Sequence, residues 1–453
     1  MRSDFEGFGR VRPATRAAVT GPLTAGALRD ATPGAFLPFG NGRSYGDTCH
    51  NDAGTLADMR GSSRVIAFNP DSGVVEAEAG VMLHQIIDYC APYGFFLPVT
   101  PGTRFVTLGG AVANDVHGKN HHARGTLGRH VEQIALVRSD GVHTLSRTVN
   151  PALFAATIGG MGLTGIITRV RLKMMKVGSL NVVERLRSFA TLDAYFDQAD
   201  AADAANEYAV AWLDQLHGER GVLMTANHAD DGDYRTAVHA PRLSVPFELP
   251  VSALNHFSLR AFNTAFHFAK ARKARRDRVT GFAGFFYPLD AVGHWNRLYG
   301  PAGLFQHQSA IPFKTARQAI PAMLDASRKA GQASFLTVLK RFGDIASPGL
   351  MSFPVPGYTL TLDFPNRGEK TLALLDDLDR ITVQAGGRVN PYKDARMSAQ
   401  TFGASFPHWT QLEALRDPAL CSDFWRRTAL GLSKNGNGSI STDDLQQNLT
   451  KVS

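Results

Sequence analysis

The sequence predicts an α+β protein, because three parts of the chain differ in their pattern of predicted strands, helices and turns. Short strands, hairpins and glycine-rich turns fill residues 1–177. Helical stretches alternate with apolar strands over residues 178–387, which is typical of an antiparallel sheet backed by helices. Single motifs and helices rich in aromatic residues and arginine follow over residues 388–453. We therefore expect a separate middle domain between two outer segments.

The first segment contains two predicted strand–turn–strand units. Val65–Asn69 and Val74–Ala79 alternate in polarity around the turn sequence P-D-S-G, which indicates a β-hairpin. Val131–Arg138 and Val142–Ser146 flank S-D-G in the same way. Between the two units, Val81–Tyr89 places apolar residues at helical spacing and predicts a short helix.

Periodicity also predicts the later elements. The first segment ends in an alternating strand, the middle segment holds two helices and three strands, and the tail is helical. The alternating strand is Ile166–Leu172, and the helical tail is Phe406–Leu432. The helices of the middle segment are Leu192–Ala205 and Thr315–Ala330, and its strands are Tyr208–Leu213, Leu304–Ile311 and Thr359–Phe364.

Composition limits the class of protein. The 453 residues are 44% hydrophobic and 19% charged, as in an ordinary globular protein with an ample core. A net charge of +8 favours anionic partners, but no RNA-binding signature or zinc-finger spacing is present, so we expect no nucleic acid. Cys49, Cys90 and Cys421 have neither disulfide nor metal-site spacing, so we expect no metal and a reducing, cytoplasmic compartment. No signal peptide or membrane-spanning run is seen, so any membrane contact would be peripheral, at the inner face.

A basic run, K-A-R-K-A-R-R-D-R, occupies Lys270–Arg278 in the middle segment. Like charges repel, so the simpler interpretation is a solvated loop. The alternative is docking to an anionic membrane surface, where each basic residue adds ~1 kcal/mol.

The stretch Thr100–His122 is the most unusual part of the chain. It places Gly102, Gly109, Gly110, Ala111 and Gly118 among Thr, Asn, Lys and three His residues, and ends in His117, Lys119, Asn120, His121 and His122. Glycines let main-chain N–H groups approach a diphosphate, and the following groups can move protons. This predicts a redox cofactor beside substrate chemistry. The alternative is a glycine-rich surface loop with solvated histidines.

Two further glycine-rich runs lie on either side of this stretch. Phe36–Gly46 (F-L-P-F-G-N-G-R-S-Y-G) indicates a strand that ends in a tight, phosphate-facing turn, although it could be a purely structural turn. It is not a G-x-G-x-x-G sequence that opens a helix, so a Rossmann unit is disfavoured. Gly159–Gly165 (G-G-M-G-L-T-G) forms a second glycine loop.

Together these motifs resemble the vanillyl-alcohol-oxidase-type flavoproteins with a PCMH-type FAD-binding domain, and in particular the flavin subunits of decaprenylphosphoryl-β-D-ribose 2′-epimerases. The similarity extends in order over most of the chain. It rests on residues 39–47, 101–122, 159–167, 286–290 (F-Y-P-L-D), 295–303 (W-N-R-L-Y-G-P-A-G), 306–308 (Q-H-Q), 352–358 (S-F-P-V-P-G-Y), 392–396 (Y-K-D-A-R) and 401–407 (T-F-G-A-S-F-P). The resemblance implies that the outer segments form one FAD-binding domain and that the middle segment forms a substrate cap.

The resemblance also implies which residues contact FAD. They come from the three glycine-rich runs and from the C-terminal segment. The implied set is Gly40, Asn41, Gly42, Arg43, Ser44, Tyr45, Gly46, Pro101, Gly102, Thr103, Thr107, Gly109, Gly110, Asn114, Val116, His117, Gly118, Gly162, Gly165, Ile166 (at the adenine end) and Lys393.

Arg43 bears on how the cofactor is held. In sugar-lactone and alditol oxidases of the superfamily, a histidine at this position bonds covalently to the flavin. Arginine cannot form that bond, so we expect non-covalent FAD. His50 lies nearby but is out of register.

The resemblance places His117, Lys393 and Tyr45 around the reacting centre. Oxidising an alcohol needs a proton acceptor, and His117, with an ordinary pKa near 6.5, is the first choice. Lys393 could accept the proton only if burial or neighbouring charge lowered its pKa. The structural alternatives are that His117 holds its loop and that Lys393 pairs with Asp394.

The implied substrate pocket is formed by the cap residues Tyr299, Gln306, Gln308, Lys340 and Thr361. Gln306 and Gln308 are two apart on a strand and share a face, and Lys340 points inward by the same alternation. A buried ammonium needs an anionic partner, such as a substrate phosphate.

Three departures set the chain apart from mycobacterial members of the group. Thr361 and Asn114 stand where those members have cysteine, and Asn390 stands where they have tyrosine. Thiol-directed inhibitors should therefore not bond at Thr361, and the pentose and lipid length stay open.

The expected reaction is FAD-dependent oxidation of the 2′-hydroxyl of a polyprenyl-phosphate-linked ribose. An NAD(P)H-dependent short-chain reductase would complete the epimerisation to the arabinose form. One alternative is an alditol or aldonolactone oxidase that uses O₂, and another is a non-catalytic flavin-binding scaffold.

Overall fold

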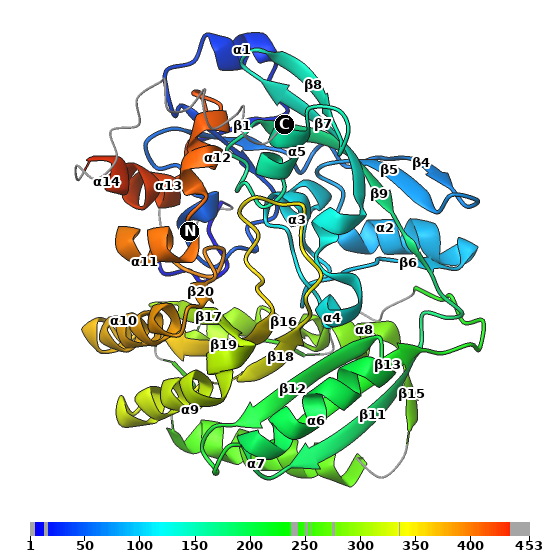
Figure 1. The fold of residues 1–453 in the computed structure, drawn as a ribbon, viewed down its shortest axis with the longest axis vertical. Helices are drawn as coiled ribbons and strands as arrows, with labels where there is room; N and C mark the ends of the chain where they lie inside the picture. Colours follow the sequence, from blue (N-terminus) through cyan, green and yellow to red (C-terminus); the bar gives the residue numbers. More distant parts are fainter. Residues whose placement is uncertain are drawn as a thin grey trace.

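The computed structural model describes residues 5–12, 17–236, 243–248, 250, 252–254, 256–273, 277–334 and 336–434. It has the α+β architecture that the sequence predicts. Figure 1 shows an upper part with two smaller sheets and a lower part formed around one large sheet.

A five-stranded antiparallel sheet in the upper part has the order β4-β5-β9-β7-β8. Both predicted hairpins are confirmed, and helices α2 and α3 pack on this sheet around an apolar core. The elements are β4 Val65–Asn69, β5 Val74–Glu78, β7 Val131–Arg138, β8 Gly141–Leu145, β9 Ile166–Lys173, α2 Leu83–Cys90 and α3 Leu108–Ala113.

A three-stranded parallel sheet, β1-β3-β2, completes the upper part and packs against the C-terminal helices. Leu37 and Phe39 of β2 share a core cluster with Phe424 and Trp425, so the two ends of the chain are packed together. The predicted helical tail is confirmed, but it is broken into short helices. The elements are β1 Ala17–Thr20, β2 Phe36–Phe39, β3 Thr55–Asp58, α11 Ala399–Ser405, α12 Trp409–Leu415, α13 Asp423–Arg427 and α14 Ala429–Lys434.

The large sheet has eight strands in the order β15-β11-β13-β12-β18-β19-β17-β20, and all neighbours are antiparallel. The antiparallel sheet backed by helices predicted for the middle of the chain is therefore confirmed. The strands are β11 Val182–Phe189, β12 Tyr208–Asp214, β13 Arg220–His228, β15 Arg278–Thr280, β17 Leu304–Pro312, β18 Val338–Phe342, β19 Gly357–Pro365 and β20 Arg388–Val389.

The two faces of this sheet differ in polarity. On one face, alternate residues such as Phe305, Leu339 and Leu360 are buried against three helices. The alternate positions carry polar side chains on the opposite face, as a period of two requires. The three helices are α6 Leu192–Ala205, α9 Phe313–Lys329 and α10 Glu369–Gln384.

Helices α7 (His256–Lys273) and α8 (Phe282–Phe286) contact the β11–β13 end of the sheet. For residues 270–273 and Arg278, the structure contradicts the interpretation of the basic run as a loop. Lys270 continues helix α7 and Arg278 opens β15, while residues 274–276 lie outside the described part.

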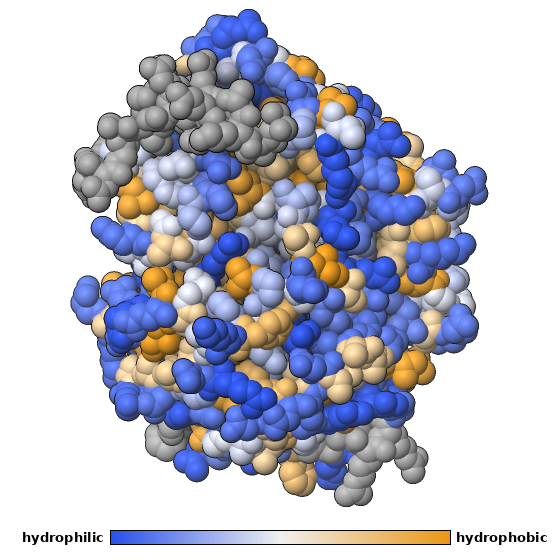
Figure 2. Space-filling model, viewed as in Figure 1, coloured by the Kyte–Doolittle hydropathy of each residue, from blue (hydrophilic) through white to orange (hydrophobic). Residues whose placement is uncertain are grey.

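The remaining elements are short. They are α1 Ala25–Arg29, α4 His121–Arg124, α5 Pro151–Thr157, β6 Phe95–Phe96, β10 Met175–Lys176, β14 Leu243–Ser244 and β16 Val292–Gly293, with 3-10 turns at Asp47–Cys49, Ala91–Tyr93, Leu127–His130, Pro288–Ala291 and Trp295–Tyr299. None of the helices in the described ranges is long and apolar enough to span a bilayer. On the face drawn in Figure 2, apolar residues lie in small separate patches among polar ones.

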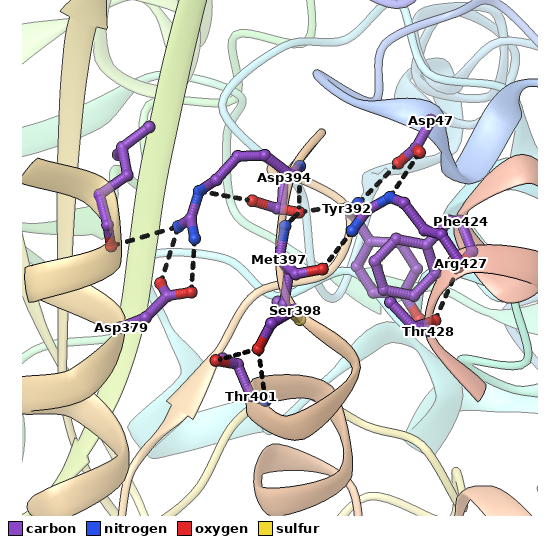
Figure 3. A network of polar contacts seen from close by, with 12 residues as sticks. Asp47, Asp379, Tyr392, Asp394, Met397, Ser398, Thr401, Phe424, Arg427 and Thr428 are labelled. Atoms are coloured by element: carbon purple, nitrogen blue, oxygen red, sulfur yellow. Dashed lines mark hydrogen bonds and ion pairs between the residues drawn. The ribbon is translucent and has the colours of Figure 1, made fainter. Parts of the chain in front are cut away.

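A buried ionic network ties the first glycine-rich turn to the C-terminal segment (Figure 3). Arg427 donates from Nε and Nη2 to the two carboxylate oxygens of Asp47, at 2.8 and 3.0 Å, and from Nη2 to Asp394 Oδ2 at 3.0 Å. Arg396 donates to Asp379 of α10 at 2.8 Å. The turn, the segment that carries Lys393 and the large sheet's helical layer are therefore held together by charged hydrogen bonds.

Candidate active site

The polar face of the large sheet carries a row of candidate substrate-binding residues. Gln306 and Gln308 of β17 lie opposite Asp363 and Thr361 of β19 in the strand register, so all four side chains share one face. Lys340 of β18 lies opposite Thr359 and joins the same face. The predicted alternation of Gln306, Gln308 and Lys340 therefore agrees with the register.

Gln308 is the centre of a hydrogen-bond network. Its Oε1 accepts from Asn390 Nδ2 at 2.8 Å, which directs its Nε2 toward Thr359 Oγ1 at 3.0 Å and His117 Nε2 at 3.1 Å. His117 Nε2 is therefore an acceptor, and its ring proton sits on Nδ1. This arrangement joins the central glycine-rich stretch, the large sheet and the C-terminal segment at one point.

Tyr45 and Lys393 meet beside this network. The main-chain N–H of Tyr45 donates to the Tyr392 carbonyl at 3.0 Å, and Lys393 Nζ lies 4.4 Å from the centre of the Tyr45 ring. Gln306 Nε2 donates to Asp363 Oδ1 at 2.5 Å, while Asp363 Oδ2 has no hydrogen-bond partner among the described residues. Asp363 is thus a buried carboxylate with one oxygen available to a ligand or to Lys393.

The pKa values in this group are shifted mainly by burial. Burial lowers the pKa of Lys393 to about 8, and the charge of Asp363 opposes that shift. Burial raises the pKa of Asp363 to about 7, against the effects of Gln306 and Lys393. The pKa of His117 lies well below its usual value because of burial and then the charge of Lys340, so the imidazole is neutral near pH 7.

Two further lysines make the site electropositive. Burial and then Lys393 lower the pKa of Lys340 to about 8, and burial and then Lys340 lower the pKa of Lys119 to about 7. Lys119 donates to the Phe285 carbonyl, and its Nζ lies 4.3 Å from the centre of the Phe285 ring. The positive charges of these lysines repel one another, and a bound anion would reduce that repulsion.

The first glycine-rich turn offers a row of free main-chain donors. Within the described ranges, the N–H groups of Asn41, Gly42, Arg43 and Ser44 make no hydrogen bond to the protein. Gly42 adopts a left-handed φ of +58°, which favours glycine. Such consecutive amides form a concave anion site.

The loop Pro101–Thr103 faces open space. A Cβ added at Gly102 would meet nothing within 4 Å, and the N–H groups of Gly102 and Thr103 have no hydrogen-bond partner in the described part of the chain. These two donor-rich loops in the upper part fit the diphosphate of FAD.

Several implied cofactor residues have a packing role instead of presenting open amides. Gly109 and Gly110 lie inside α3, where their N–H groups donate to the Ala79 carbonyl and to Thr107 Oγ1, which caps the helix. Gly118 passes close to the Thr100 carbonyl, where a Cβ would lie 2.9 Å away. The expectation of exposed amides along the whole stretch is therefore wrong for Gly109 and Gly110.

Other implied residues border the site through the main chain or through weaker contacts. Asn114 Nδ2 lies 3.5 Å from Ser44 Oγ, and Val116 packs against the core beneath the stretch. Ile166 is fully buried in a separate apolar cluster, so only its main chain could approach a cofactor. Gly162 and Gly165 have positive φ values and pack against Pro38 and Leu136.

Tyr299 and Arg43 both lie near Tyr45. Tyr299 is buried in the cluster that contains Tyr45, and its hydroxyl has no partner among the described residues. Arg43 lies between the rings of Phe8 and Phe105, at 5.6 and 5.7 Å from their centres. Burial lowers its pKa, and Asp290 opposes the shift.

Sequence reasoning missed Asp363 and Thr359. Both lie two residues from Thr361 on β19 and therefore on the same face, so the alternation that identified Gln306 and Gln308 could have found them. Asp363 adds an acidic side chain to this sheet face.

Comparison with known proteins identifies the class. Residues 25–146 match the model of a family described as an FAD binding domain. Together with the two-part fold and the large antiparallel sheet, this match defines an FAD-dependent oxidoreductase of the vanillyl-alcohol-oxidase type.

Similarity to individual proteins identifies the family. Decaprenylphosphoryl-beta-D-ribose oxidase of Mycolicibacterium smegmatis is 31% identical over 450 residues, which cover 94% of this chain and 97% of that protein. An uncharacterized protein in the mprA 5′ region of Streptomyces coelicolor is 32% identical over 375 residues, 77% of this chain and all of that protein. A putative D-arabinono-1,4-lactone oxidase of Neurospora crassa is 26% identical over 183 residues, 40% of this chain and 32% of that protein. The chain therefore belongs to the family of FAD-dependent oxidoreductases that contains the M. smegmatis oxidase.

Proposed function

We propose that the protein oxidises the 2′-hydroxyl of a polyprenyl-phosphate-linked ribose to the 2′-keto sugar. The observation that carries this proposal is the polar sheet face, where Lys340 and Lys393 gather beside His117 with Asp363 as the acidic partner. The two half-buried lysines favour an anionic sugar over a neutral one, whereas the neutral His117 adds no charge. Similarity to the M. smegmatis oxidase over nearly the whole of both chains supports the same substrate class.

In this reaction, bound FAD supplies the acceptor for the hydride that leaves the sugar carbon. The hydroxyl proton must go to the protein. Lys393 suits this role because its pKa is lowered to about 8, so a substantial fraction of the amine is neutral and can accept the proton at Nζ. We therefore assign the proton transfer to Lys393 in preference to His117.

His117 has a positioning role in this proposal. Its Nε2 lone pair is already used by the Gln308 amide, and its pKa is low. A neutral imidazole fixed in this way can donate from Nδ1 but is a poor base. Tyr45 covers the Lys393 amine, and its own pKa is raised well above the usual value by burial, so the phenol stays protonated.

The substrate phosphate would lie against Lys119 and Lys340, whose mutual repulsion it would relieve. Gln306 and Thr361, on the same sheet face, would hydrogen-bond the sugar hydroxyls. The domain division at residues 177 and 387, with the outer segments forming one FAD-binding domain, remains part of this proposal.

We also propose that FAD is held non-covalently, because Arg43 stands where covalent relatives use histidine. The keto product would pass to an NAD(P)H-dependent short-chain reductase, which would deliver the arabinose form for cell-envelope glycan synthesis. In this proposal the protein works in the cytoplasm, at the inner face of the membrane that holds the lipid-linked sugar.

A second candidate is an aldonolactone or alditol oxidase that uses O₂. The similarity to the N. crassa lactone oxidase favours it, but that match covers only 40% of this chain. The excess of lysines at the site fits an anionic substrate better than a neutral polyol or lactone.

The test is steady-state oxidation with an artificial electron acceptor across four substrates: a short-chain prenylphosphoryl ribose, its arabinose epimer, a free alditol and an aldonolactone. We expect turnover with the phosphoribose lipid, and a 10²- to 10⁴-fold lower kcat/KM for Lys393→Met. Thr401→Ala, on α11, is the matched control and should behave as wild type. Preference for the alditol or lactone with O₂ would overturn the proposal in favour of the second candidate.

A further inference from the structure

Helix α7 presents an apolar stripe to solvent. Its outward residues follow helical spacing, and Phe268, which is 63% exposed, lies at the centre of the stripe. A single exposed apolar side chain is ordinary, but a contiguous apolar surface with a polar rim marks an interaction site. A shallow, mostly apolar hollow on this face is lined by Arg260, Ala261, Thr264, Ala265 and Phe268, and the exposed stripe continues through Ala269 and Arg272.

The charge on this helix has one sign. The sequence of α7 contains Arg260, Lys270, Arg272 and Lys273 and no Asp or Glu. Among the described residues, Arg272 has no carboxylate partner, and its guanidinium lies 5.8 Å from the centre of the Phe268 ring. Arg260 Nε lies 3.2 Å from His217 Nε2 on the neighbouring turn. The exposed arginines are therefore available to external anions.

Carboxylates on neighbouring elements do not neutralise the positive charge of Arg260 and Arg272. Lys270 points inward, with Nζ 3.7 Å from Glu184 of β11. Asp214 beneath the helix is fully buried and already paired with Arg220 and His217. Asp277, just beyond the helix, is paired with Arg185. The carboxylates near α7 are thus neutralised by partners other than Arg260 and Arg272.

The inner side of α7 lies against the candidate active site's side of the large sheet. Leu259 belongs to the same buried cluster as Tyr45 and Tyr299. Phe266 packs on Trp212 at 4.8 Å, and Trp212 lies opposite Val338 in the register, on the face that also carries Lys340. Figure 1 shows α7 at the lower end of the molecule, away from the smaller sheets. Helix α7 therefore covers the polar sheet face at its β12 end.

We propose that the outer face of α7 docks on an anionic lipid bilayer, with Phe268 among the headgroups and Arg260 and Arg272 on lipid phosphates. Small residues flank one aromatic ring and two cations, which is the composition of an interfacial helix. A second copy of the chain is a poorer fit, because a stable interface needs about 20–30 residues a side and this stripe offers far fewer.

This docking does not rest on the proposed substrate, since bilayer binding is measured without any sugar. It also relocates the predicted membrane contact. The contact begins at Arg260, upstream of the basic run, and depends on an exposed aromatic residue that charge counting does not reveal.

The experiment is vesicle flotation of the purified FAD-loaded protein with phosphatidylcholine alone or mixed with phosphatidylglycerol. The test variants are Phe268→Ser and the double variant Arg260→Ala/Arg272→Ala. The matched controls are Val142→Ser, an apolar side chain 72% exposed on β8, and Arg171→Ala, an exposed base on β9. Bound flavin absorbance and size-exclusion profiles check that each variant is folded.

We expect wild type and both controls to float with the mixed vesicles only. Each test variant should bind them at least about tenfold more weakly. Absence of wild-type binding, or equal binding by wild type and the test variants, would overturn the proposal. A wild-type dimer that Phe268→Ser converts to a monomer, without vesicle binding, would also overturn it and assign the face to a second copy.

Discussion

The amino nitrogen of Lys393 lies 4.4 Å from the centre of the Tyr45 ring, so the first glycine-rich turn and the C-terminal segment meet at the candidate reacting centre. The approach depends on the next residue. A Cβ at Gly46 would lie 1.3 Å from the Asp394 carbonyl oxygen, a distance that no side chain can occupy. Lys393 is therefore positioned by a main-chain contact that only glycine permits.

Gly46→Ala should separate the turn from the C-terminal segment. The clash is with backbone, which cannot rotate away, so we expect loss of bound flavin together with a lower melting temperature. Differential scanning fluorimetry and the flavin-to-protein absorbance ratio would measure both. A variant with wild-type flavin content and stability would contradict the described contact.

Gly102→Ala should separate cofactor binding from folding. The added methyl group meets no protein atom within 4 Å, so the melting temperature of the flavin-free protein should not change. If FAD lies along this loop, the same methyl group should weaken FAD binding about tenfold or more, because such overpacking costs ~1–3 kcal/mol. Titration of the flavin-free protein with FAD, followed by flavin fluorescence, tests this, and unchanged affinity would remove Gly102 from the cofactor site.

The pH dependence of kcat/KM should report Lys393. The amine must be neutral to accept a proton, so activity should rise with pH through about 8 and then level off. Asp363 raises the pKa of Lys393, so Asp363→Asn should move the rising limb to lower pH. Asp193→Asn, an exposed carboxylate paired with Arg317, is the control and should leave the limb in place. If kcat/KM of Asp363→Asn still rises near pH 8, Asp363 does not influence the group that accepts the proton.

The buried ionic network should be worth far more than a surface pair. Arg427→Met removes two hydrogen bonds to the buried Asp47 and one to Asp394, while Arg12 Nη1 still donates to Asp47 Oδ2 at 3.0 Å, so the loss should be about 1.5–3 kcal/mol of unfolding free energy. Arg317→Met removes exposed pairs with Asp193 and Asp197 and should cost less than about 1 kcal/mol. Urea unfolding of both variants makes the comparison, and equal losses would show that the network is not a structural anchor.

The mode of FAD attachment can be tested without any substrate. Because Arg43 cannot bond to the isoalloxazine ring, acid precipitation should leave all the yellow flavin in the supernatant. Flavin that remains with the precipitated protein would show a covalent link at another residue and would contradict the non-covalent proposal.

Local patterns predicted much of the fold. The alternation of Leu304–Ile311 was enough to place Gln306 and Gln308 on one face, because side-chain direction in a strand has a period of two. That Thr361 shares this face follows from the register of β17 and β19. Helix α7 was missed because its apolar residues are spread around the helix among basic residues, which reads as a charged loop. The short helix over Gly109 and Gly110 was missed because glycine has low helix propensity, and the cap by Thr107 decides the conformation there.

Contacts between distant segments could not be predicted from such patterns. The pairing of Arg427 with Asp47 and the orientation of Gln308 toward His117 depend on how the two ends of the chain pack against the large sheet. Which side of α7 is exposed likewise depends on tertiary packing, because its other side contacts Trp212 and the cluster that contains Tyr299. Tertiary contacts, and not local propensity, therefore define the chemistry of the site.

The most direct test of the central claim is anaerobic mixing of the FAD-loaded protein with a short-chain prenylphosphoryl ribose while the yellow flavin absorbance is followed. We predict rapid bleaching in the wild type, with a 2′-keto sugar formed in the same molar amount, and much slower bleaching in Lys393→Met. A flavin that stays oxidised with this substrate, or that is bleached instead by a free alditol or lactone, would contradict the claim.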